Sequence, residues 1–235
     1  MPALLAFDTS GERIHVGVSV GEAAWVAEEA GGSQASANLI PCVRRVLDRA
    51  GIGLRELDAI ACGHGPGAFT GLRAACSAAQ GLAWGAGLPV LPVDTLMAVA
   101  EDARARAGAR DVWVAMDARM GEIFAGRYRW SDAGWATLVA PALVTPDALA
   151  ALCASHPSRW LAGSALGVHA ARLQCRPEVT LDPEAGPRAH ALLACARAAW
   201  ARDKLLDPAD AIPLYLRDKV ALTIAQRKAG ARSAA

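Results

Sequence analysis

Two short segments of the sequence combine residue types that could bind a phosphate group. The first is Asp8-Thr9-Ser10-Gly11, which follows an apolar run, and the second is the glycine-dense stretch Gly63–Gly71, which includes Gly65 and Gly67. Phosphate sites use backbone N–H groups, small hydroxyls and a carboxylate that can hold a metal ion, and glycine permits close backbone approach. Each segment can also be explained as a structural turn. Neither has the spacing of a Walker or dinucleotide fingerprint.

The rest of the sequence lacks the patterns of better-known catalytic centres. Its five histidines form no H-x-x-x-H or H-E-x-x-H pair, and no serine lies in a Gly-x-Ser-x-Gly elbow. The six cysteines include no C-x-x-C pair, and most lie in apolar stretches that are typical of reduced, buried thiols. We therefore predict no metal site and a reducing, cytoplasmic environment.

Charge and hydropathy disfavour further classes of protein. The formal net charge of the 235 residues is +1, whereas a standalone nucleic-acid binder usually carries a basic excess. One uncharged stretch, Ala74 to Val93, has the length of a membrane span, but Gly87-Leu88-Pro89 would break a spanning helix. We predict no contact with a membrane.

The two candidate phosphate segments lie within a regular order of elements. Apolar runs with short turns between them predict an antiparallel meander, and longer periodic runs predict helices. The expected strands cover 3–7, 14–20, 23–29, 58–62 and 88–93, and the expected helices cover 38–50, about 71–84 and 95–106. For the first helix we expect Asn38 to be the N-cap, which would place Pro41 in the first turn.

The same order of elements begins again after residue 106. Asp8 and Asp117 each precede the start of the next strand by six residues, which indicates a weak internal duplication. The predicted fold class is α/β, with two duplicated βββαβα-type domains and mixed sheets. We expect domains over 1–106 and 107–205, with 206–225 packing back on the first, and a disordered tail over 226–235. The cleft between the domains is the default ligand site, where Asp8 and Asp117 could form a carboxylate pair.

The first two expected helices are candidates for a partner surface. Small residues cover most faces of the helix that follows the glycine stretch, so another helix could approach it closely, although a buried crossover helix explains the same composition. Packed against an equivalent pair, the two helices would form a four-helix contact. The candidate partner-interface residues are Leu39, Ile40, Val43, Val46, Leu47, Leu72, Cys76, Ala79 and Ala83.

Five segments together resemble the bacterial TsaB family over roughly residues 3–220. These segments are Phe7–Ser10, Ala61–Arg73, Ser77–Ala83, Met116–Glu122 and Tyr215–Arg217. The resemblance implies an actin-like ATPase (ASKHA) fold and a non-catalytic role beside the paralogue TsaD. TsaD places a threonylcarbamoyl group on the adenosine next to the anticodon of tRNAs that read codons beginning with A. A TsaB protein is expected to bind and activate TsaD in a heterodimer that TsaE joins, to form a homodimer when TsaD is absent, to meet tRNA only indirectly, and to need no cofactor.

The sequence departs from TsaD where TsaD holds its metal. Thr95 and Val99 occupy the positions of two histidines in the TsaD motif, and neither replaces an imidazole as a ligand. Asp117-Ala118-Arg119-Met120 is bulky where TsaD is glycine-rich. These departures favour a protein without catalytic chemistry. The alternatives are an active phosphotransferase that uses Asp8 for Mg²⁺ and, less favoured, a metalloprotease.

Overall fold

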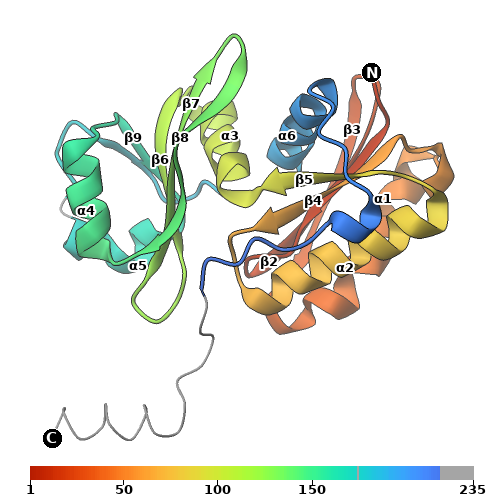
Figure 1. The fold of residues 1–235 in the computed structure, drawn as a ribbon, viewed down its shortest axis with the longest axis horizontal. Coiled ribbons are helices and arrows are strands. Elements are labelled where there is room, and N and C mark those ends of the chain that lie inside the picture. The colour runs from red at the N-terminus through yellow and green to blue at the C-terminus, as the bar shows by residue number, and fades with distance from the viewer. Residues whose placement is uncertain (174, 218–235) are drawn as a thin grey trace, which may run out of the picture.

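The chain folds around two five-stranded mixed sheets with the same strand order (Figure 1). The structure, a computed structural model, describes residues 1–173 and 175–217. The first sheet has the order β3-β2-β1-β4-β5 and the second β8-β7-β6-β9-β10. In each half, three antiparallel strands are followed by two strands that run parallel to the first. The predicted α/β fold with two duplicated, actin-like units is thereby confirmed.

The first half begins with the meander and continues with alternating helices and strands. Its central strand β1 is buried throughout, with Leu5 and Phe7 facing one layer of helices and Leu4 and Ala6 facing the other. The elements are β1 (Leu4–Asp8), β2 (Arg13–Val20), β3 (Ala23–Ala30), α1 (Ala35–Ala50), β4 (Ala59–Gly65), α2 (Phe69–Ala86), β5 (Val90–Asp94) and α3 (Thr95–Ala107). Helices α1 and α2 cover one face of this sheet.

The second half repeats the same order of elements. They are β6 (Asp111–Asp117), β7 (Ile123–Ser131), β8 (Gly134–Val144), α4 (Pro146–Ser155), β9 (Trp160–Ala162), α5 (Ala165–Leu173), β10 (Thr180–Asp182) and α6 (Ala189–Ala201). Strand β10 was not predicted, because three residues carry too little periodicity to register. Helices α4 and α5 pack on the face formed by Trp113, Ala115 and Ile123.

Helices α3 and α6 are exchanged between the halves. Helix α3 follows the first sheet but packs against the second, where Leu96 and Val99 join Val112 and Val114 in one core. Helix α6 lies in the sequence range expected for the second domain, yet its Leu192 packs on the first sheet. The two helices therefore lie between the sheets, and each half completes the core of the other.

Helix α1 begins earlier than the sequence predicted. Gln34 is its N-cap, so Pro41 lies inside the helix rather than in its first turn. The Asn38 amide instead donates to the carbonyl of Ala30 at 3.0 Å. Pro41 and Ala37, whose carbonyl loses its helical donor, both lie on the exposed side, where water can serve that carbonyl.

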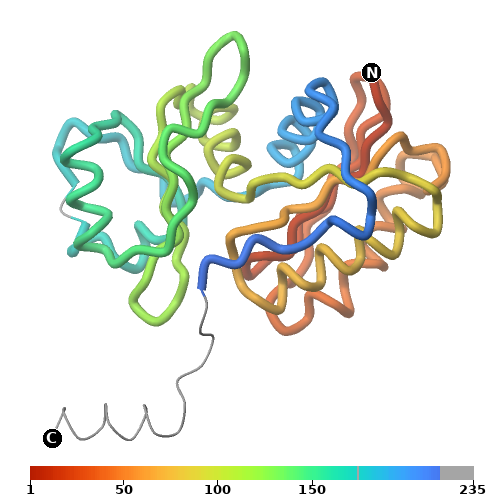
Figure 2. The backbone as a smooth tube through the Cα atoms, viewed as in Figure 1, coloured from red at the N-terminus to blue at the C-terminus, as the bar shows by residue number. Residues whose placement is uncertain are grey.

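The last described residues run from the first half to the second (Figure 2). Leu206 pairs with Val90 of β5, and the Leu214 N–H donates to the carbonyl of His64 at 2.7 Å. Leu216 then packs against the core that includes the second sheet, and Arg217 pairs with Glu122. Residues 218–225 and the expected tail 226–235 lie outside the described residues. Within 1–173 and 175–217, no helix has both the length and the apolar character to cross a membrane.

Candidate functional site

The two candidate phosphate segments meet at a cleft between the halves. The cleft has a volume of about 600 Å³. Ser10, Gly67 and Thr95 line it from the first half, and Asp117 and Ser164 from the second. The segment Leu214–Arg217 forms a further wall. This is the cleft in which the sequence analysis placed the default ligand site.

Asp8 lies behind the cleft wall and is closed off from solvent. Its side chain is fully buried, and one carboxylate oxygen accepts from the Ser10 N–H at 2.7 Å and from the Ser10 hydroxyl at 2.6 Å. The Thr95 hydroxyl donates to the other oxygen at 2.8 Å. Burial raises the pKa of Asp8 above its usual value, although the bonds from Ser10 and Thr95 oppose the shift. A carboxylate with both oxygens engaged and no exposed surface does not fit the role of a Mg²⁺ ligand.

The glycines of the loop are explained by close packing on the Asp8–Ser10 turn. A Cβ atom on Gly63 would lie 1.8 Å from a carboxylate oxygen of Asp8, and one on Gly71 would lie 2.0 Å from the carbonyl oxygen of Thr9. A Cβ on Gly67 would lie 2.4 Å from the Ser10 Cβ. The space that a phosphate-binding loop keeps open is here filled by the neighbouring turn.

Gly65 meets the C-terminal segment rather than the turn. It has a φ of +120°, and a Cβ added there would lie 2.9 Å from the carbonyl oxygen of Leu214. Only glycine combines this backbone conformation with such a close neighbour. Gly65 therefore serves the contact that fastens residues 212–217 across the end of β4.

The arginines that line the cleft are already paired with carboxylates. Arg13 pairs with Glu28, Arg119 with both Glu12 and Asp117, and Arg217 with Glu122.

His15 adds no charge to this cleft at neutral pH. Burial, with the positive charges of Arg188 and Arg13, lowers the pKa of His15 to about 4. Within the described part of the chain, the cleft thus offers no unpaired cation to a triphosphate.

Asp117 repeats the turn of Asp8 with bulkier neighbours. Its carboxylate accepts from the Arg119 N–H, as Asp8 accepts from Ser10, and the His169 ring lies 3.4 Å away. Arg119 and Met120 both adopt left-handed backbone conformations, with φ of 62° and 57°. Asp8 and Asp117 thus bind separate sets of partners, and the structure shows no contact that would make them a working pair.

The two residues at the TsaD histidine positions are absorbed into the protein interior. Thr95 is tied to Asp8, and Val99 is fully buried between α3 and the second sheet. Among residues 1–173 and 175–217, no group of three or more His, Cys, Asp or Glu side chains is placed to hold a metal ion.

Comparisons with known proteins match this chain to the TsaB proteins and, more remotely, to the TsaD transferases. The family model described as TsaD, tRNA N6-adenosine threonylcarbamoyltransferase, matches residues 28–169. The tRNA threonylcarbamoyladenosine biosynthesis protein TsaB of Escherichia coli (strain K12) is 35% identical over 191 residues, which cover 78% of this chain and 80% of that protein. The chain belongs to the TsaB family. The YeaZ structure from Pseudomonas aeruginosa, 37% identical, superposes with a TM-score of 0.84 over 92% of this chain and 100% of its own.

The TsaB protein of Haemophilus influenzae (strain ATCC 51907 / DSM 11121 / KW20 / Rd) is 42% identical over 122 residues, 52% of this chain and 51% of that protein. These relatives associate the TsaB-family chain with the biosynthesis of threonylcarbamoyladenosine in tRNA. The match to the TsaD model indicates that the two families share a scaffold.

Most of the expected partner-interface residues lie inside the protein. All except Ile40 are buried between α1, α2 and the rest of the first half, with exposed fractions of 8% or less, and so have little surface to offer a partner; they are Leu39, Val43, Val46, Leu47, Leu72, Cys76, Ala79 and Ala83. Ile40 is 40% exposed. The helical period identified an apolar face correctly, but that face is covered by the first sheet.

The outer face of α2 carries residues that the sequence analysis did not name for the partner surface. Trp84 is 72% exposed, the largest aromatic surface on α2, and Ser77 and Gly81 lie on the exposed side of the same helix. A Cβ added at Gly81 or Gly85 would meet nothing within 4 Å. The helical spacing of the sequence could have shown this exposure, since it places Trp84 away from the apolar stripe formed by Cys76, Ala79 and Ala83.

Proposed function

We propose that this TsaB-family chain is a non-catalytic subunit that binds and activates the TsaD transferase during threonylcarbamoyladenosine synthesis in cytoplasmic tRNA. TsaE joins the larger assembly, and the chain pairs with itself when TsaD is absent. The observation that carries the proposal is the buried carboxylate of Asp8, whose two oxygens are both engaged in hydrogen bonds and are therefore not free to hold a metal ion in the cleft. The paired arginines of the cleft support it, because none is left to bind a nucleotide phosphate.

The contact with TsaD is assigned to the exposed sides of α1 and α2. Small residues at Ser77, Gly81 and Gly85 allow a second helix to approach α2 closely. Ile40 and Trp84 offer apolar area that water would otherwise cover. The expectation of a four-helix contact is thus kept, but its residues move from the buried stripe to the opposite side of each helix.

The test is a charge placed on this surface. We expect Ile40→Glu, alone or with Ser77→Arg, to abolish co-elution with TsaD on gel filtration and to reduce TsaD-dependent tRNA modification at least tenfold in a reconstituted reaction. Val168→Glu is the matched control, because Val168 is an exposed aliphatic residue, 62% exposed, on α5 of the other half. Ala79→Arg is unsuitable, since Ala79 is fully buried and the substitution would disrupt the core.

Each outcome bears on a separate part of the proposal. Unchanged co-elution of Ile40→Glu with TsaD would reject this surface. Full modification of tRNA without the chain would reject an activating role. Turnover of ATP by the isolated chain would reject a non-catalytic one.

A further inference from the structure

A second groove lies at the opposite end of the second sheet from the cleft. Asp117 ends β6 at the cleft, whereas Asp111, at the start of the same strand, lines this groove. Its volume is about 850 Å³, within the usual range of ligand sites. Arg110, Arg159 and Trp160 line it, together with the hydroxyl residues Ser158 and Thr180.

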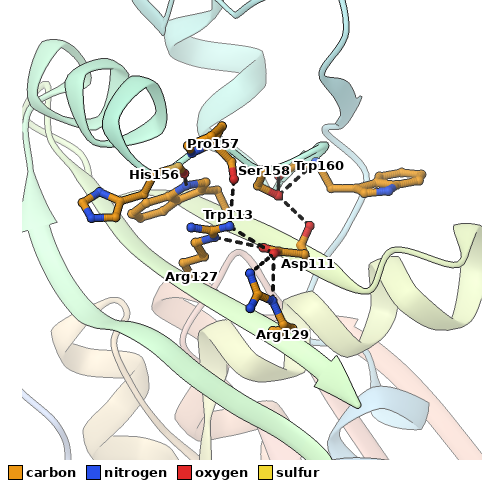
Figure 3. A network of polar contacts seen from close by, with 8 residues as sticks. All are labelled: Asp111, Trp113, Arg127, Arg129, His156, Pro157, Ser158 and Trp160. Carbon is orange, nitrogen blue, oxygen red and sulfur yellow. Dashed lines mark hydrogen bonds and ion pairs between the residues drawn. The ribbon is translucent and has the colours of Figure 1, made fainter. Parts of the chain in front are cut away.

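The carboxylate next to this groove is already neutralised. Arg127 donates to both oxygens of Asp111 at 2.9 and 3.0 Å, and Arg129 donates to one of them at 2.7 Å (Figure 3). Arg127 also donates to the carbonyl of Pro157 at 2.7 Å, which fixes the turn that carries Ser158 and Arg159. Asp111 is therefore not available to neutralise other cations.

Arg110 and Arg159 are left as exposed cations beside this network. Both side chains are exposed, and within residues 1–173 and 175–217 neither forms an ion pair, while Arg13, Arg119 and Arg217 of the cleft all do. Glu178 is the other acidic residue of the groove lining. Arg127 and Arg129 together with Arg110 and Arg159 outnumber the two acidic residues of the lining, Asp111 and Glu178. The groove and its wall therefore carry a local excess of positive charge, although the net charge of the whole chain is only +1.

The remaining lining residues add a stacking surface on a fixed frame. Trp160 is half-buried: it packs against the core that includes Val112 and Val114, and its ring points away from the ion-pair network (Figure 3). The Ser158 hydroxyl donates to the carbonyl of Asp111 at 2.6 Å and accepts from the Trp160 N–H at 3.2 Å, so the backbone below the indole is held in place. The Trp113 indole N–H donates to the carbonyl of His156 at 2.9 Å, which also holds the residues next to the turn at Pro157 and Ser158 in place.

We propose that this groove binds an RNA strand, with Arg110 and Arg159 on successive phosphates and Trp160 against a base. Guanidinium groups pair with phosphodiester oxygens, and an aromatic face beside them is the usual platform for an unpaired base. The RNA is the tRNA whose modification the family serves, so this chain contacts it directly rather than only through a partner. The groove lies on the second half, so the inference does not depend on the proposed TsaD surface of α1 and α2.

The test measures the anisotropy of a fluorescently labelled, unmodified tRNA transcript as the full chain is added. We expect binding in the micromolar range at low salt, as for other weak electrostatic contacts to nucleic acids. Arg110→Gln with Arg159→Gln should weaken it about tenfold and reduce the slope of log affinity against log salt by about 1.5, because two phosphate contacts are lost. Trp160→Leu should weaken binding about fivefold or more without changing that slope.

Arg55→Gln with Lys204→Gln is the matched control, since it removes the same charge from exposed positions outside the groove lining. The control should bind as the unaltered chain does, and far-UV circular dichroism verifies that every variant is folded. The proposal is overturned if the unaltered chain shows no binding, if the groove variants bind normally, or if the control variant loses as much affinity as they do.

Discussion

The side chain of Asp8 is fully buried behind the cleft wall, and both of its oxygens accept hydrogen bonds. Ser10 and Thr95 supply three hydrogen bonds to its two oxygens, and the adjacent Gly63 allows no other group between the loop and the turn. The same residues that resemble a phosphate site in the sequence therefore act as a fastening between β1, β4 and α3.

The buried carboxyl of Asp8 makes stability depend on pH in a defined direction. Its folded-state pKa is raised above 3.8, so the folded protein holds this proton more tightly than the unfolded chain. The contribution of Asp8 to stability is therefore greatest below pH 3.8 and is lost as the pH rises through the folded-state pKa. Asp8→Asn, a neutral side chain of the same shape, should gain stability relative to the unaltered chain over this rise.

Urea unfolding of both proteins at a series of pH values from about 4 to 8 measures this difference. We expect it to grow in favour of Asp8→Asn as the pH rises and then to level off once Asp8 is ionised in the folded protein. A difference that stays constant over the whole range would contradict a pKa of Asp8 that burial raises in the folded protein.

Two sets of ion pairs differ in how far their side chains are exposed to solvent. Asp111, at the start of β6, joins Arg127 and Arg129 of β7, and Arg127 is nearly buried with 10% of its side chain exposed. Burial works to raise the pKa of Asp111, but the hydrogen bonds and positive charges of Arg127 and Arg129 outweigh it and lower that pKa. Glu12 and Arg119, which link the two halves across the cleft, are 77% and 67% exposed.

Removal of Asp111 should therefore lower the free energy of unfolding much more than removal of Glu12. Asp111→Ala leaves the charge of Arg127 buried without a partner and should lower the free energy of unfolding by roughly 2–3 kcal/mol, a buried-pair value reduced for the partial exposure of Asp111. Glu12→Ala should change it by less than about 1 kcal/mol, because solvent screens an exposed pair. Urea unfolding at pH 7 compares them, and equal losses would show that burial does not control these pairs.

The exchange of α3 and α6 makes the two halves one cooperative unit at the scale of the whole molecule. The first sheet needs α6, which is encoded after the second sheet, and the second sheet needs α3, which is encoded before it. Residues 212–217 add a further connection from β4 to the second half. Unfolding of either half would therefore remove a helix from the other half and expose its core.

We expect the full chain to unfold in urea in a single transition. The midpoints from tryptophan fluorescence and from far-UV circular dichroism should coincide, since local unfolding of one half would remove a helix from the other. A fragment of residues 1–106 should fail to fold, because its first sheet lacks α6 and its α3 lacks the second sheet. Two separated transitions, or a folded and monomeric fragment, would contradict this cooperativity.

The sequence by itself determined the order of the elements, the duplication and the buried faces of the helices, because these depend on periodicity and on turn residues close together in the chain. It could not tell which surface covers each face, and so it took the buried stripe from Leu39 to Ala83 for a partner surface. The tertiary structure alone decided that the glycine loop packs on the Asp8 turn, that α3 and α6 exchange sheets, and that Arg110 and Arg159 share a groove. These features arise from contacts between residues far apart in sequence, such as Thr95 and Asp8, which are 87 positions apart. Local patterns of residue type do not encode such contacts.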